Sequence, residues 1–258
     1  MKIKDVIATL EVFAPLPLQE EYDNAGLQVG VTEAEISGVV LCLDVTEEVL
    51  AEAVEKGCNM VVAHHPLLFR PLRRLGDTSQ VERCVRFAVM HGITIYAAHT
   101  NLDNSQGGVN YEIASRLELQ DTAFLLDGNQ GGGSGIIGSL PHPMTATDFV
   151  ARVKDVFSVE CAMCNALLER PVSRVAVCGG AGDFLLSEAV RQGADAFITG
   201  EVHYHQFFGL EQVIQVLAIG HYQSEQFTPC LLQRVINQAY PVIPTFVTKV
   251  NTNPILYL

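Results

Sequence analysis

The sequence predicts an α/β protein made of two similar three-layer domains. Short apolar segments rich in β-branched residues alternate with segments of helical periodicity, an order typical of sheets covered by helices. Residues 39–65 also align without a gap on residues 175–201, so one α/β unit occurs twice. A chain of 258 residues is long enough to bury two cores of modest size.

The predicted elements of the first half follow this alternation. Residues 2–13 form an amphipathic helix because Ile3, Val6, Ile7, Leu10 and Phe13 share one face, and the prolines after it prevent its continuation. The strands and helices that follow are predicted from short apolar runs and from helical spacing. The strands are expected at 38–44, 59–63 and 93–98, and the helices at 46–56, 80–91 and 109–118.

The glycine-rich segment at 128–135 predicts a domain boundary, because five glycines in eight residues carry a high ordering cost and pack no core. We therefore expect an N-terminal domain at 1–127 and a C-terminal domain at 128–258. In the latter, strands are predicted at 135–140, 174–178, 196–199 and 215–220, helices at 145–156, 183–192 and 224–239, and a closing strand at 242–249. That last strand could complete the second sheet or return to the first.

Composition narrows the class of protein. The content of 48% hydrophobic and 17% charged residues is typical of a folded protein and not of a disordered one. The net charge of −13 argues against nucleic-acid binding, which depends on Lys and Arg at phosphates. Seven cysteines in mostly apolar segments are typical of reduced thiols, and no apolar run reaches the roughly 18 residues of a membrane span. A cytoplasmic protein is expected.

Histidines and carboxylates follow the predicted strands in both halves. His64-His65, His99, Gly200-Glu201 and His221 each stand where a strand ends, and the carboxyl ends of parallel strands meet at one edge of a sheet. The segment 93–103 matches 215–225, so His99-x3-Asp103 corresponds to His221-x3-Glu225. The repeat thus predicts a ligand site built from both halves.

The donor types indicate a metal centre. His221 and Glu225 are one helical turn apart, and Asp103 lies in a polar loop from which its carboxylate could bridge two ions. A set of nitrogen and oxygen donors suits Zn, Fe, Mn, Co or Ni, and bridging carboxylates favour two divalent ions per chain over one. Asp183 is predicted to cap a helix after a glycine turn, whereas His203 and His205 could line the cleft or lie on the surface.

Five motifs in order resemble the NIF-three-like family, also named the GTP cyclohydrolase I type 2 family. They are DNAGLQVG at 23–30, HHP at 64–66, AHTNLD at 98–103, GEVHYH at 200–205 and GHYQSE at 220–225. The resemblance implies metal ligands at His64, His65, Asp103, His221 and Glu225, with His99 as a sixth ligand or a neighbour of one. It also implies two α/β domains with the site in the cleft between them, and a toroidal homohexamer. Glu201 is added from the internal repeat.

Two functions fit these residues. The first is a dinuclear metal-dependent hydrolase, by resemblance one that opens the guanine ring of GTP with activated water and releases formate. His99 and Glu201 are then the candidates for proton transfer. The second is a non-catalytic metal-binding protein for metal delivery or regulatory protein interaction, because exchangeable ligands can also hand over a metal. The sequence leaves the metal, the substrate and catalysis in the cell open, and it favours the hydrolase.

Overall fold

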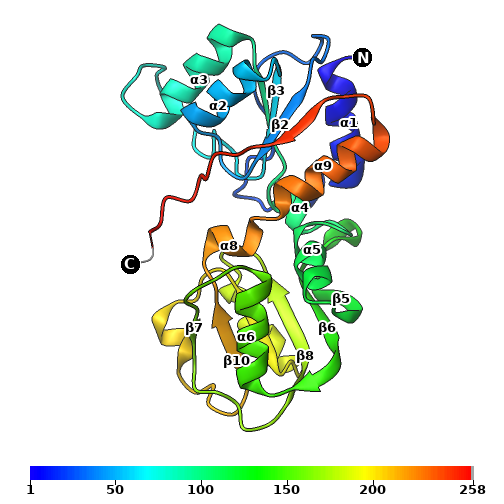
Figure 1. The fold of residues 1–258 in the computed structure, drawn as a ribbon, viewed down its shortest axis with the longest axis vertical. Helices are drawn as coiled ribbons and strands as arrows, with labels where there is room; N and C mark the ends of the chain where they lie inside the picture. Colours follow the sequence, from blue (N-terminus) through cyan, green and yellow to red (C-terminus); the bar gives the residue numbers. More distant parts are fainter. Residues whose placement is uncertain (257–258) are drawn as a thin grey trace. The chain divides into compact units, whose positions relative to one another are not determined.

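The computed structural model describes residues 1–256 and contains two compact α/β units. The first unit comprises residues 1–102 and 228–256, and the second comprises residues 103–227. The chain passes from the first unit to the second within the short helix α4 (Thr100–Asp103) and returns just before α9 (Thr228–Ala239) (Figure 1).

The first unit has a five-stranded sheet. Its strand order is β1 (Gly26–Val29), β4 (Thr94–Ala97), β3 (Met60–Ala63), β2 (Val39–Cys42) and β11 (Thr245–Val247). The last four strands are parallel, and β1 pairs antiparallel with β4. Every residue of β2, β3 and β4 is buried, which is the pattern of strands covered on both faces.

Helices cover this sheet. Helices α2 (Glu47–Glu55) and α3 (Gln80–His91) share one core cluster with β2, β3 and β4. On the opposite face, α1 (Ile3–Phe13) packs against α9, and α9 packs against β2 and β11 (Figure 1). The starts of α2 and α3 are fixed by Thr46 and Ser79, whose hydroxyls accept the amides of Val49 and Glu82 at 3.3 and 3.2 Å.

The second unit has a six-stranded mixed sheet. Its order is β5 (Gln120–Asp127), β6 (Gly133–Met144), β8 (Val172–Cys178), β9 (Ala196–Thr199), β10 (Gln215–Ala218) and β7 (Met163–Cys164). Strands β8, β9 and β10 are parallel, and the remaining pairs are antiparallel. The helices are α5 (Val109–Arg116), α6 (Ala146–Val156), α7 (Leu186–Arg191) and α8 (His221–Glu225). Short 3-10 turns are η2 (Asn129–Gly131), η3 (Asp183–Leu185) and η4 (Tyr204–Phe207) in this unit and η1 (Leu16–Leu18) in the first unit.

The predicted α/β class is confirmed, and the predicted strands and helices of both repeats are present. The glycine-rich segment is not a linker, however: it is the turn of the β5–β6 hairpin, in which the Gly128 amide donates to the Gly132 carbonyl at 2.8 Å. Gly131 has a φ of +81°, which glycine adopts at little cost. Residues 103–127 consequently belong to the second unit, whereas the expected boundary lay at 127/128.

The C-terminal segment also differs from the simplest expectation. Strand β11 pairs in parallel with β2, with Phe246 opposite Val40, so the last strand returns to the first sheet. The single helix expected at 224–239 is two helices, α8 and α9. Pro229 explains the second start, because proline lacks an amide hydrogen and is favoured in a first turn. None of the helices within residues 1–256 combines the length and apolar character of a membrane span.

Candidate metal centre

Three histidines gather at the carboxyl edge of the first sheet. His64 and His65 follow β3, and His99 follows β4. A ring nitrogen of His64 and one of His65 lie within 4.8 Å of each other. The His99 ring centroid is 5.3 Å from that of His64 and 5.5 Å from that of His65. These distances suit imidazoles that face a common small ligand.

Each of the three imidazoles is held through Nδ1. His64 Nδ1 lies 2.7 Å from the Ala98 carbonyl oxygen, His65 Nδ1 lies 2.7 Å from Asp44 Oδ1, and His99 Nδ1 lies 2.7 Å from Asp23 Oδ1. A carbonyl or carboxylate can only accept, so Nδ1 carries the hydrogen and Nε2 is the ring nitrogen with a lone pair. Such partners fix the tautomer and orientation of metal-binding histidines in proteins.

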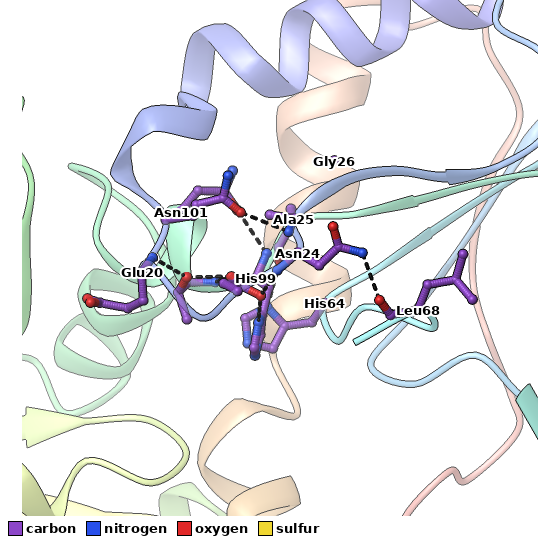
Figure 2. Close-up of polar contacts among 12 residues, drawn as sticks. Glu20, Asn24, Ala25, Gly26, His64, Leu68, His99 and Asn101 are labelled. Carbon is purple, nitrogen blue, oxygen red and sulfur yellow. Dashed lines mark hydrogen bonds and ion pairs between the residues drawn. The ribbon is translucent and has the colours of Figure 1, made fainter. Parts of the chain in front are cut away.

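Asp23 is the anchor of His99. Its side chain is fully buried, and it accepts the amides of Asn24 at 2.6 Å and Thr100 at 3.0 Å as well as the Thr100 hydroxyl. Burial raises the pKa of this carboxyl, but the hydrogen bonds from His99 and Thr100 outweigh it and lower the pKa to about 2. Figure 2 shows His99 beside His64. Asp23 therefore keeps its charge and the orientation of the ring.

Asp44 plays the same part for His65. It stands two residues after β2, and its second oxygen accepts the hydroxyl of Thr252 at 3.0 Å. Burial raises the pKa of Asp44, but the hydrogen bond from His65 contributes to lowering it, and the overall shift is downward. The C-terminal segment thus supports His65 through this carboxylate, since Thr252 contacts Asp44 across a separation of 208 residues.

In the second unit, a His–Glu pair lies at the carboxyl edge of the parallel strands. His221 opens α8, and Glu225 is one turn later, with His221 Nε2 3.2 Å from Glu225 Oε2. Glu201, which follows β9, places Oε1 3.0 Å from His221 Nδ1. Glu225 is buried and Glu201 is exposed. Glu201 therefore orients His221 here, in the way that Asp44 orients His65.

A glycine loop after β8 surrounds the Glu225 carboxylate. Gly180 has a φ of +62°, and a Cβ added there would lie 2.5 Å from Glu225 Oε1. The loop amides are engaged inside the unit: Gly179 donates to Asn110 Oδ1 at 2.9 Å, Gly180 to Ser224 Oγ at 2.9 Å and Gly182 to Thr199 Oγ1 at 3.0 Å. This loop consequently shapes the pocket of the Glu225 carboxylate.

Asp103 is the last residue of α4, where a polar loop was expected. Its backbone carbonyl accepts the Asn110 side-chain amide at 3.1 Å. Burial raises the pKa of the Cys178 thiol, and the negative charges of Asp103 and Glu225 raise it further. Both carboxylates therefore act on the same part of the second unit.

The sequence identified the histidines but not what holds them. Asp44 could have been found by the strand-end argument, since it stands two residues after β2 as His65 stands two residues after β3. The only sequence signal for Asp23 was its position in the DNAGLQVG motif.

Two other predicted residues have different surroundings from those expected. Asp183, expected to cap a helix, instead accepts a hydrogen bond from His203. His205 packs with Tyr204 and Phe208, with ring centroids 5.2 and 6.2 Å away.

Residues 1–254 match the Duf34/NIF3 (NGG1p interacting factor 3) family. The chain belongs to this family. A Duf34/NIF3 relative from Clostridium acetobutylicum, named GTP cyclohydrolase 1 type 2 homolog, is 31% identical over 98% of each chain. One of the same name from Lactococcus lactis is 35% identical over 80% of this chain and 79% of its own.

Solved structures agree with the family assignment. Staphylococcus aureus protein SA1388 has a TM-score of 0.91 at 26% identity, covering 100% of this chain and 99% of its own. A Bacillus cereus protein related to NIF3 has a TM-score of 0.89 at 24% identity, with 100% and 99% coverage, and this likeness concerns the fold alone. The Duf34/NIF3 fold thus extends over the whole chain.

Proposed function

We propose that this Duf34/NIF3 protein is a dinuclear metal-dependent hydrolase. Two divalent ions would be held by five side chains, namely His64, His65, Asp103, His221 and Glu225. When bound, such ions lower the pKa of water and offset developing negative charge on a substrate. The five residues supply nitrogen and oxygen donors, which fit Zn, Fe, Mn, Co or Ni.

One observation carries this proposal. His64, His65, His99 and His221 each have Nδ1 bonded to a carbonyl or carboxylate, at distances between 2.7 and 3.0 Å. Four imidazoles with the same nitrogen anchored all direct Nε2 away from their anchor. A partner of this kind gives a metal-binding histidine its orientation and raises the basicity of the nitrogen that faces the metal.

The names of the relatives support GTP as the substrate class to test first. In that reaction water attacks C8 of guanine, the C8–N9 bond breaks, and a second water releases formate from the formamide. His99 and Glu201 are the proton-transfer candidates that the sequence suggests. The ring of His99 is directed by Asp23, while Glu201 is bonded to His221, so the task of Glu201 in this proposal is to orient a ligand.

The test couples metal content to turnover. Metal per chain is measured by elemental analysis on wild type, Asp103→Ala and Glu225→Ala, with Glu160→Ala as an exposed carboxylate control in the same unit. Formate release from GTP is measured on the same samples. We expect two metals and formate production in wild type and Glu160→Ala, and loss of both in the other variants.

Two results would change the proposal. Two metals per chain without turnover, at enzyme concentrations that exclude slow reaction, would leave the metal centre and favour metal delivery or a regulatory interaction. Metal content that is the same in Asp103→Ala, Glu225→Ala and wild type would refute the ligand set itself.

The proposal extends to the oligomeric state and the cellular compartment of the protein. We infer a homohexameric ring in the cytoplasm, supported by the family membership and by seven unpaired cysteines, which suit a reducing compartment. Light scattering of the purified protein should give six times the mass of one chain, and a monomer would exclude the ring.

A further inference from the structure

A further histidine–carboxylate pair, His203 and Asp183, lies outside the proposed ligand set. The Nδ1 hydrogen of His203 is donated to Asp183 Oδ2, and the backbone amide of His203 donates to the same oxygen at 3.3 Å. The Asp183 side chain is 12% exposed, whereas that of His203 is 86% exposed. A nearly buried carboxylate therefore holds an imidazole that reaches solvent.

The position of this pair in the fold relates it to the proposed chemistry. Asp183 opens η3 after the glycine loop that surrounds Glu225, and His203 follows Glu201 by two residues, just before η4. Glu201 in turn orients His221. Both members of the pair thus stand at the carboxyl edge of the second sheet, where ligands of α/β proteins gather.

The geometry assigns the two ring nitrogens different tasks. Because Asp183 accepts from Nδ1, the neutral imidazole carries its lone pair on Nε2, the nitrogen that faces away from the carboxylate. The hydrogen bond and the charge of Asp183, followed by the charge of Glu201, raise the pKa of His203. The other titratable groups beside it on η4 are Tyr204 and His205. An anchored imidazole with an accessible nitrogen is the arrangement of a general base.

A purely structural role explains less of this arrangement. If Asp183 served only to start η4, its bond to the His203 amide would suffice. That amide has another acceptor in Gln206 Oε1 at 3.2 Å, within the same turn. The bond to the His203 ring adds nothing to the turn that these two acceptors do not already provide, but it does fix the tautomer.

We propose that His203, positioned by Asp183, transfers the proton in the hydrolytic reaction, the task for which the sequence suggested His99 and Glu201; this rests on the function proposed above. As the water oxygen bonds to C8 of guanine, Nε2 takes one proton from that water. As the C8–N9 bond breaks, its electron pair goes to N9, which takes this proton back from the imidazolium. The second hydrogen of the water ends on N7 of the formamide, so atoms and charge balance for the ring opening, and a second water then releases formate.

The test compares four forms of the metal-loaded protein. They are wild type, His203→Ala, Asp183→Asn and His142→Gln, the last being an exposed histidine on β6 of the same unit. Metal per chain and circular dichroism establish that each form is folded and loaded. Formate release from GTP is then measured across pH, with and without added imidazole.

Three results are expected. His203→Ala should lose roughly 100-fold or more in kcat, the typical contribution of general acid–base catalysis, and should regain part of it with imidazole. In Asp183→Asn the ascending limb of the kcat/KM profile should move to lower pH, because the group that raises the pKa of His203 has lost its charge. His142→Gln should match wild type.

The opposite results separate the two proposals. Wild-type turnover that survives in His203→Ala with an unchanged pH profile would overturn the role of His203 and leave the hydrolase intact. Loss of activity without imidazole rescue, or with loss of metal, would show a structural role and also overturn it. A loaded wild type without any turnover would remove the hydrolase and this assignment together.

Discussion

Replacing Asp23 by asparagine tests whether a buried charge holds His99 in place. The substitution keeps the size of the side chain but removes its negative charge. An amide can accept from only one of its two ends, and its NH2 group would then face the Thr100 donors that now point at Asp23 Oδ2. We expect asparagine to lose part of this network at neutral pH.

The size of the expected loss of stability follows from the pKa of Asp23. A fall from the usual 3.8 to about 2 corresponds to roughly 2 kcal/mol of stability, at about 1.4 kcal/mol for each pKa unit. Because the folded-state pKa of Asp23 lies below its unfolded-state value, this stabilisation is fully present above about pH 5 and is lost as pH falls through about 2. At pH 3 about half of it should remain.

Urea denaturation of the metal-free protein measures this contribution. The unfolding free energy of wild type minus that of Asp23→Asn should be about 2 kcal/mol at pH 7 and decrease by about 1 kcal/mol between pH 5 and pH 3. Taking the difference removes the titration of the other carboxyl groups. Asp127→Asn, an exposed site on β5, should show a difference near zero throughout.

A difference that stays constant from pH 7 to pH 3 would refute this reasoning. It would mean that Asp23 has the same pKa in the folded and unfolded chains, so that its contacts with His99 and Thr100 do not favour the charged form. A difference that grows as pH falls would reverse the sign and imply that Asp23 is protonated in the folded protein.

Two further substitutions test the second unit. Gly180→Ala should weaken metal binding and destabilise the fold by more than the roughly 1–2 kcal/mol of a left-handed backbone alone, because its Cβ would meet the Glu225 carboxylate. Gly193→Ala is the matched control, since Gly193 has a φ of +71° with nothing within 4 Å of the added Cβ. Equal metal affinity in the two variants would contradict the expected contact between the added Cβ at position 180 and the Glu225 carboxylate. Glu201→Gln should lower metal affinity roughly 10- to 100-fold in a chelator competition, as removal of a ligand-orienting carboxylate does, and unchanged affinity would show that His221 needs no such anchor.

The local elements could be read from the sequence because their signals are local. Strands β2, β3 and β4 are short apolar runs that stay buried on both faces, and α3 has a serine cap at one end and Gly92 at the other. The glycine-rich segment at 128–135 was wrongly predicted to be a linker. Glycines without side chains to pack in a core occur both in linkers and in the turns of hairpins. Only the pairing of β5 with β6 distinguishes them.

The strand-end histidines and the His221–Glu225 pair were determined by the sequence, since strand ends and helical spacing fix where such side chains emerge. Only the tertiary structure decided which group orients each imidazole. Asp23 meets His99 across 76 residues, Asp44 meets His65 across 21, and Asp183 meets His203 across 20. Contacts of this kind depend on how chain segments pack, and no periodicity along the chain encodes them.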